Sequence, residues 1–222
     1  ATYNTTIYQL NNMDLLAGFE SYSHKIKYLG GSNSKLYNPT IGELNNAINT
    51  PPSVSSYTHE YATLGYLARA QYDYDGKYFV SASYRRDASS RFHPDNRWGN
   101  FGSIGLAWLM TKEDFMSGID WIDMLKVKAI YGVQGNDNLG TSSYYYYAYA
   151  DQFSVTNSNG DYAVSFAFKG NKDITWETSH AFNAGFDFEL FGSRFNGTVE
   201  YFNRKTSDLL YNQPVPISYG YY

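Results

Sequence analysis

The chain has 222 residues, of which 19% are aromatic and 17% are charged, and it contains no cysteine. The lack of cysteine excludes a disulfide-rich scaffold, and the aromatic content excludes an intrinsically disordered chain. The formal net charge is −4 and the 17 lysine and arginine residues are scattered, which excludes a basic stripe for nucleic acid.

Alternation of side chains with a period of two residues predicts β-strands along most of the chain. In residues 62–74, for example, the even positions are apolar or aromatic, whereas the odd positions are small or polar except for Leu67. In chain order, the expected strands are residues 5–10, 13–28, 62–74, 78–85, 103–108, 125–134, 176–190 and 195–204. No run has the period of an amphipathic helix, and only a short helical turn is expected at residues 112–116.

The connections between these strands differ in length in a regular way. Tight turns are expected at Asn11-Asn12, Asp75-Gly76 and Gly192-Ser193, because such dipeptides favour hairpins. Long loops are expected at residues 30–59 and 135–173, and a shorter hairpin loop at 88–96. In an up-and-down meander the tight turns then fall at one end and the long loops at the other, as in outer-membrane barrels. Only the connection at 111–123 is longer than this pattern predicts.

Two architectures fit this alternation: a soluble β-sandwich and the wall of a membrane barrel. The runs 62–74 and 176–190 are much longer than the 5–6 residues typical of soluble strands. Aromatic residues crowd the ends of the apolar faces, where rings suit the level of lipid headgroups. The opposite faces carry charges among small residues, as a wet lumen tolerates. These features favour an all-β fold, an antiparallel up-and-down transmembrane β-barrel section of about eight strands.

Several sequence blocks resemble the SusC/RagA family of TonB-dependent outer-membrane transporters. The blocks occur in the family's order and are residues 66–74, 83–92, 94–99, 125–136, 173–178 and 204–211, among them the segments Pro94-Asp95-Asn96-Arg97-Trp98-Gly99 and Asp173-Ile174-Thr175-Trp176-Glu177-Thr178. The resemblance covers nearly the whole chain and is most specific over residues 60–216.

The resemblance implies a barrel of roughly 22 strands that is filled by a plug domain and lies in the bacterial outer membrane as a multi-pass protein. It also implies a SusD-like surface lipoprotein as partner, energy from the TonB complex, contact with outer-membrane lipid, and oligosaccharide or peptide as cargo. Nothing in residues 1–222 resembles a plug, a TonB box or a signal peptide. We therefore interpret residues 1–222 as a partial barrel domain, and we expect that it does not insert alone as a functional pore, because its edge strands would be unpaired in lipid.

Two sets of residues are candidates for function. Tyrosines in an expected outward loop could stack on sugar rings or pack on neighbouring loops, and packing is the favoured of the two interpretations; they are Tyr144, Tyr145, Tyr146, Tyr147 and Tyr149. Charged residues on the non-apolar faces are expected to face the lumen and to hold the plug more often than cargo; they are Arg69, Arg85, Asp87, Glu177, Asp187, Glu189 and Glu200.

Catalytic and metal-binding patterns are weak. Ser90, His93 and Asp95 contain the residue types of a hydrolytic triad, but three residues of one turn rarely converge on one atom. The segments 136–138 and 159–161 hold oxygen ligands without the spacing of a calcium loop. We expect no cofactor, no metal and no enzymatic activity. The alternatives to an importer are a soluble β-sheet carbohydrate-binding module and an outer-membrane enzyme built on a closed barrel.

Overall fold

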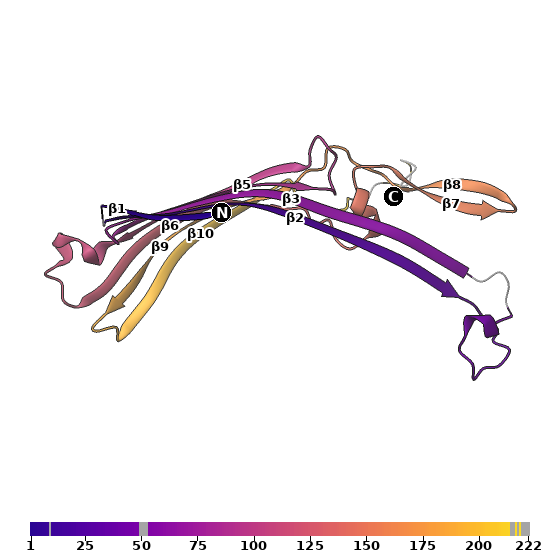
Figure 1. The fold of residues 1–222 in the computed structure, drawn as a ribbon, viewed down its shortest axis with the longest axis horizontal. Coiled ribbons are helices and arrows are strands. Elements are labelled where there is room, and N and C mark those ends of the chain that lie inside the picture. Colours follow the sequence, from indigo (N-terminus) through magenta and orange to yellow (C-terminus); the bar gives the residue numbers. More distant parts are fainter. Residues whose placement is uncertain (9, 49–52, 214–215, 217, 219–222) are drawn as a thin grey trace.

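The computed structural model describes residues 1–8, 10–48, 53–213, 216 and 218, which form one large antiparallel sheet and a small hairpin beside it (Figure 1). The large sheet has eight strands in the order β1-β2-β3-β4-β5-β6-β9-β10. Its strands are β1 (Thr2–Ile7), β2 (Asn11–Ser32), β3 (Ser53–Tyr74), β4 (Tyr78–Ser89), β5 (Trp98–Leu109), β6 (Ile122–Asn136), β9 (Glu177–Leu190) and β10 (Phe195–Ser207). The strands follow one another as a meander, so the predicted topology is confirmed. β1 and β10 form the two edges and the sheet is not closed.

The sheet is a single layer without a hydrophobic core of its own. Among the residues that the structure describes, the buried hydrophobic side chains are Ala88, Phe92, Ala148 and Trp176. A soluble sandwich of this length would bury one face of every strand against a second layer. No helix in the described part of the chain is long and apolar enough to cross a membrane.

The first tight turn lies earlier than the sequence predicted. Asn11 and Asn12 are not turn residues but begin β2, where Asn12 lies opposite Thr6 on one side and Asp73 on the other. The asparagine side chains accept hydrogen bonds within the sheet, from the Thr6 hydroxyl at 2.9 Å and from the Tyr72 hydroxyl at 2.5 Å. The chain reverses around Tyr8, whose φ is +53°. Turn propensity at Asn11-Asn12 is thus overridden by ladder pairing.

The loop predicted at 30–59 is wrong in its bounds, because β2 and β3 continue far beyond the neighbouring strands. β3 pairs with β4 only from Thr63 onward, so residues 23–32 and 53–62 form a two-stranded arm (Figure 1). Rings are stacked along its inner face: Tyr28 lies 4.9 Å from Tyr57, measured between ring centroids, and Tyr57 lies 4.6 Å from His59. The outer face is polar and carries an ion pair between Lys25 and Glu60.

Apolar alternation stops where the outer face of the arm becomes polar, so the pattern used for the sequence prediction could not reveal these residues as strand. The connecting segment contains a short 3₁₀ turn, η1 (Leu44–Asn46), and residues 49–52 lie outside the described part.

The long loop predicted at 135–173 contains regular structure that the sequence prediction missed. It holds a 3₁₀ turn, η4 (Ser143–Tyr147), and a hairpin of β7 (Gln152–Ser158) and β8 (Asp161–Phe168). Asn159 and Gly160 have φ values of +55° and +96°, as a tight hairpin turn requires. The oxygen-rich segment 159–161 is therefore a turn.

The connection between β5 and β6 contains two 3₁₀ turns, η2 (Met110–Lys112) and η3 (Asp114–Met116). The short helical turn predicted at 112–116 is thus found. As the sequence indicated, this connection is longer than the other turns at its end of the sheet.

Candidate functional site

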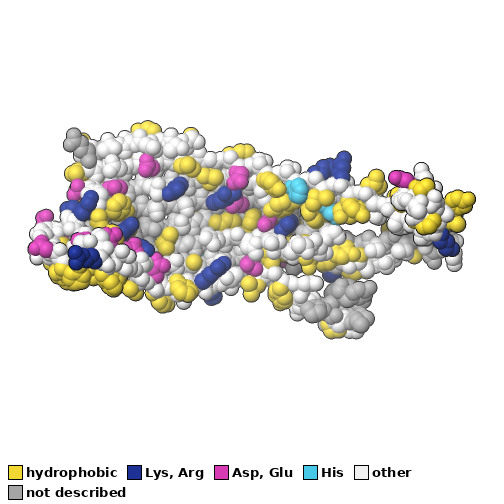
Figure 2. Space-filling view, turned by 90° about the horizontal axis from the view of Figure 1, so that it is seen from below, with side chains coloured by type: hydrophobic (Ala, Val, Ile, Leu, Met, Phe, Trp, Pro, Cys, Tyr) yellow, Lys and Arg dark blue, Asp and Glu magenta, His cyan; other side chains and the backbone are white. Residues whose placement is uncertain are grey.

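The register of the sheet places the charged residues of the expected lumen on one face. Arg69 lies opposite Ser83, and Asp187 lies between Lys126 and Thr198. By the same alternation, this face carries the following charged residues: Arg69, Arg85, Asp87, Glu177, Asp187, Glu189 and Glu200. We call this the inner face, and Figure 2 shows basic and acidic side chains interspersed over it.

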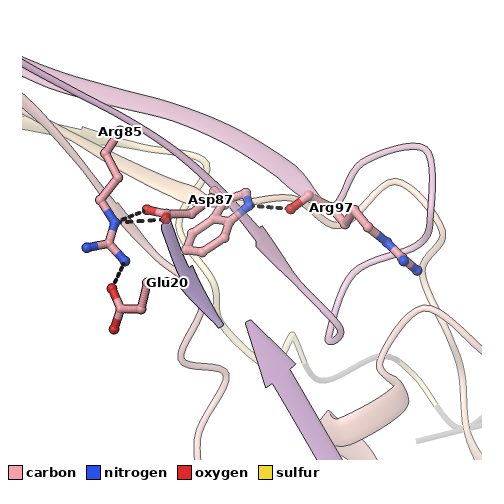
Figure 3. A network of polar contacts seen from close by, with 5 residues as sticks. Glu20, Arg85, Asp87 and Arg97 are labelled. Atoms are coloured by element: carbon pink, nitrogen blue, oxygen red, sulfur yellow. Dashed lines mark hydrogen bonds and ion pairs between the residues drawn. The ribbon is translucent and has the colours of Figure 1, made fainter. Parts of the chain in front are cut away.

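Arg85 joins two strands of the inner face (Figure 3). Its Nη2 donates to Glu20 Oε2 of β2 at 2.8 Å, and its Nε donates to Asp87 Oδ2 at 2.7 Å. The two carboxylates hold the guanidinium in a fixed orientation across β3. Arg85 is therefore fully paired, and with one cation and two carboxylates the group leaves one net negative charge on the inner face.

A second ionic group lies across β6, β9 and β10. Lys128 Nζ is 2.8 Å from Asp187 Oδ1 and 2.7 Å from Glu200 Oε1, and the Thr198 hydroxyl also donates to Asp187 at 2.8 Å. One cation thus bridges two carboxylates from separate strands. These ion pairs connect β6, β9 and β10 with one another and leave the inner face polar.

The inner face is hollowed toward the tight-turn end of the sheet. A cavity of about 540 Å³ lies there, and its lining includes side chains of both charge signs, such as Asp14, Lys126 and Glu200. Small residues such as Ser81 and Gly105 form much of the remaining surface. The lining thus mixes charged and polar side chains with small and apolar ones, and its charges suit contact with water or with a folded domain rather than with lipid.

The opposite face, here the outer face, carries exposed apolar side chains. In β5, Ile104 is 51% exposed and Leu106 is 54% exposed, and neither has an apolar layer packed on it. In β3 the apolar positions run from Leu64 to Tyr74, which matches the about 9–11 residues that a tilted strand needs to cross a bilayer. Beyond them, the outer face of β2 carries Lys25 and Lys27, so the apolar belt ends within the strands.

Aromatic rings mark the lower edge of this belt, next to the tight turns. Tyr78 stacks on Trp108 with ring centroids 6.2 Å apart, and Phe115 of η3 lies edge-on to the same indole. Glu113 accepts a hydrogen bond from the Tyr78 hydroxyl at 2.6 Å and from Trp108 Nε1 at 3.0 Å. The bond from Tyr78 is the main reason why the pKa of Glu113 is lowered from its ordinary value of 4.5. Rings with a polar edge suit the headgroup level.

A second set of rings marks the upper edge. Tyr66 stacks on Trp98 at 6.1 Å and contacts Phe19 at 5.3 Å, and Arg86 lies over the Trp98 ring at 5.1 Å. Tyr66 and Tyr74 are eight positions apart in β3, which corresponds to about 26 Å along the strand. Tyr74 contacts Tyr78 of the lower set. For strands tilted by about 40°, the two sets of rings therefore enclose a band about 20 Å high, comparable with the apolar band of about 25 Å in outer-membrane barrels.

Trp176 forms a buried cluster with Phe92 and Phe101 at the upper end of the sheet. Its ring contacts Phe92 at 5.5 Å and Phe101 at 5.2 Å, and its Nε1 donates to the Arg97 carbonyl at 2.9 Å (Figure 3). Gly99 and Gly135 allow this packing, because a Cβ at either position would collide with the Phe101 ring. The cluster joins four blocks on which the family resemblance rests, which are residues 83–92, 94–99, 125–136 and 173–178.

The tyrosines of the long loop are divided among several partners. Tyr144 and Tyr145 pack on Phe168 of β8, with centroid distances of 5.5 and 6.2 Å. Tyr146 stacks on His59 of the arm at 4.6 Å, and Tyr149 lies edge-on to His93 at 5.8 Å. Tyr144, Tyr145, Tyr146 and Tyr147 lie in the 3₁₀ turn η4 and Tyr149 follows it, an arrangement that the sequence did not predict. Tyr144 and Tyr147 remain 37% and 38% exposed.

Asp137 is a site residue that the sequence considered only as part of an oxygen-rich segment. Its Oδ2 accepts hydrogen bonds from the Tyr61 hydroxyl at 2.8 Å and the Ser89 hydroxyl at 2.6 Å. Arg91 donates to its carbonyl at 2.9 Å and lies over the Tyr61 ring at 4.6 Å. The carboxylate thereby fixes the start of the long loop to β3 and β4. No sequence signal identifies these partners, because they are brought together only by the sheet register.

The residues of the possible triad do not converge. Ser90 Oγ accepts a hydrogen bond from the Ala62 amide at 3.0 Å, and His93 Nδ1 lies 3.3 Å from Asp95 Oδ2. No hydrogen bond joins Ser90 to His93 in the described part of the chain. Over the same residues, no group of three or more His, Cys, Asp and Glu side chains could hold a metal ion.

Comparisons with known proteins agree with a sheet that has one charged face and one apolar face. The sequence profile of the family described as "TonB dependent receptor-like, beta-barrel" matches residues 1–222. The chain belongs to this family. It is 35% identical to TonB-dependent receptor P39 of Formosa agariphila, over 99% of the chain and 21% of the relative. It is 29% identical to TonB-dependent receptor SusC of Bacteroides thetaiotaomicron, over 73% of the chain and 17% of the relative.

Among solved structures, that of the RagAB peptide transporter matches with a TM-score of 0.89 and 26% identity, over 99% of this chain and 24% of the matched one. The resemblance to the SusC/RagA family and the barrel fold are thus confirmed. The chain spans about a fifth of the length of the curated relatives it matches. The family consists of transporters and receptors of the outer membrane rather than enzymes.

Proposed function

We propose that this chain forms part of the wall of a TonB-dependent outer-membrane importer, which takes up oligomeric nutrients, glycan or peptide, together with a SusD-like surface lipoprotein. The observation that carries the proposal is the division of one open sheet into a charged inner face and an exposed apolar outer face bounded by rings. Family membership supports the same reading. In the complete protein the outer face contacts lipid, and the strands cross the membrane many times.

The inner face would surround a plug domain supplied by other parts of the protein. Arg85 and Lys128 are each paired with two carboxylates of the wall, so a polar domain that lies against them meets no unpaired cation, and each group presents one excess negative charge to it. Its movement under force from TonB would then break few strong contacts with this section. As a section with two unpaired edge strands, residues 1–222 would not form a stable pore alone.

The soluble carbohydrate-binding module fits the structure less well. Its outer side chains would need a second layer, yet the described residues bury few hydrophobic side chains. Exposed apolar area on this scale requires lipid or a large partner.

Uptake measurements on the full-length receptor test the proposal. Cells that lack the receptor gene are complemented with wild type and supplied with fluorescent neutral oligosaccharides or oligopeptides, with and without an intact TonB complex. We expect uptake of one of these classes that depends on both the receptor and TonB. Uptake that continues without TonB, or that is the same without the receptor, contradicts the proposal.

A further inference from the structure

A second cavity, of about 610 Å³, lies in the long loop between β6 and β9. Rings of Tyr144 and Tyr145 line one side, and Tyr211, which follows β10, lines another. Side-chain amides of Asn171, Asn212 and Gln213 complete the polar part of the lining. The volume falls within the range of small-molecule binding sites. The cavity therefore combines aromatic faces with neutral hydrogen-bonding groups.

The loop itself holds this cavity open. Gln152 Nε2 donates to the carbonyls of Tyr144 and Tyr147 at 2.8 and 3.2 Å, which fixes η4 to the start of β7. The backbone amide of Asn171 donates to the Ala148 carbonyl at 3.0 Å and closes the other end of the loop. Because these bonds lie within the loop itself, a ligand does not have to order η4 or the end of the loop.

The segment after β10 is also fixed. The Leu210 amide donates to Glu177 Oε2 at 3.2 Å, so the position of Tyr211 follows from the start of β9. The Tyr211 side chain is 72% exposed beyond this anchor. One wall of the cavity is thus held by bonds within the long loop, and the other is held by the start of β9.

Polar groups in the lining have unused hydrogen-bonding capacity. Within the described residues, the hydroxyls of Tyr144, Tyr145 and Tyr211 make no hydrogen bond, and neither do the side-chain amides of Asn212 and Gln213. These groups offer both donors and acceptors to a ligand. The rings beside them offer flat apolar area at low entropic cost.

The lining carries no free charge. Lys169 is its one charged side chain among the described residues, and its Nζ is bound to Asp151 Oδ2 at 2.9 Å. Asp151 also accepts from the Gly170 amide at 2.9 Å; the bond from Lys169 is the main reason why the pKa of this carboxyl is lowered. An anionic ligand, or a peptide end with its charge, would find no unpaired counter-ion here.

We infer that this cavity binds a segment of a neutral oligosaccharide. Sugar rings have an apolar face that matches the tyrosines and hydroxyls that match the amides, and they need no ionic partner. The inference rests on the proposed function, because it names the substrate class that the outward loops of the importer contact first.

The test uses the full-length receptor purified with its partner. Binding is measured by isothermal titration calorimetry with maltohexaose, cellohexaose, xylohexaose and mannohexaose as neutral probes, a hexamer of alginate as an anionic probe, and hexaalanine as a peptide probe. We expect at least one neutral probe to bind, and its affinity to fall tenfold or more in the double variant Tyr144→Ala/Tyr211→Ala. The control Tyr162→Ala changes a tyrosine of β8 that is 84% exposed and outside the cavity, and it should bind as wild type does.

Because Tyr144 also packs on Phe168, the variant Tyr144→Phe/Tyr211→Phe keeps the rings and removes only the hydroxyls. It should weaken binding by several fold. Equal binding of a neutral glycan by the wild type and both double variants overturns the inference, and so does binding of hexaalanine or alginate alone. If TonB-dependent peptide uptake persists while no neutral probe binds, the importer stands and the cavity assignment fails. If no oligomer is taken up, the importer itself is wrong.

Discussion

Replacement of Trp176 by alanine should loosen both loops that the Trp176 cluster joins. The indole is 9% exposed, contacts the rings of Phe92 and Phe101, and donates a hydrogen bond to the Arg97 carbonyl. Truncation of a buried tryptophan costs about 3–5 kcal/mol, which includes the cavity that it leaves. At about 1.4 kcal/mol per factor of ten, a loss of 3 kcal/mol raises the equilibrium for local opening by roughly 150-fold.

Hydrogen exchange followed by mass spectrometry of the full-length receptor measures this opening directly. We expect amides of residues 88–97 and 171–176 to exchange about 100-fold faster in Trp176→Ala. Trp176→Phe keeps the ring packing and removes one hydrogen bond, and since the Arg97 carbonyl still accepts from the Ser89 amide, the effect should be about tenfold or less.

The matched control is Trp121→Ala, at the tight-turn end, where the indole is 52% exposed and stacks on Phe191. It should leave exchange at 88–97 and 171–176 unchanged. If Trp176→Ala exchanges within threefold of wild type in those segments, the cluster does not hold the loops and the reasoning is refuted.

Three further predictions follow from the outer face, the turn end and the arm. Ile104→Arg places a charge on the outer face and should reduce barrel assembly, at a cost of about 2–4 kcal/mol, whereas Ser103→Arg, one residue away on the inner face, should assemble; heat-modifiable migration on gels measures both. The lowered pKa of Glu113 means that its ionised form stabilises the turn above pH 4.5, and that this contribution is lost as the pH falls through the lowered pKa. Hydrogen exchange of the amides of residues 110–121, corrected for intrinsic rates, should therefore become faster over that pH range in the wild type. The variant Glu113→Gln should show no such step. Tyr146→Ala removes the stack on His59 and should raise exchange at 143–147 about threefold to tenfold, whereas Tyr147→Ala, whose ring contacts no other ring in the described residues, should not.

Alternation with a period of two residues predicted the strands where one face of the sheet is apolar and the other is polar. It failed in the arm, where the two faces do not differ in this way. Residues 62–74 alternate between an apolar and a polar face, and the structure confirms them as strand, whereas it begins this strand earlier than predicted, at Ser53. In the arm both faces lie beyond the apolar belt, so Lys25 and Tyr28 show no apolar alternation although they are strand residues. Strand pairing there depends on cross-strand rings, and such pairs lie far apart in sequence.

Some features of the candidate site could be predicted from side-chain alternation, and others could not. The inner charges share a face because alternation fixes the side of every strand residue once one is known. Their partners are not predictable from alternation, since the pairing of Arg85 with Glu20 requires the register of strands that are 65 residues apart in sequence. The tyrosine run is a local signal that marks an aromatic loop, but whether each ring packs or stays accessible depends on Phe168 and His59.

The long loop between β6 and β9 is attached to the strands of the sheet and to the arm, and these attachments set the shape of the surface that it presents. Asp137 fixes the start of the long loop to β3 and β4, the Trp176 cluster fixes its end to β5, and Tyr146 fixes its middle to the arm. All three attachments use residues of this chain and lie above the apolar belt. The shape of the loop is thus set by the same strands that cross the membrane, and a ligand that meets the loop meets a surface that is already formed.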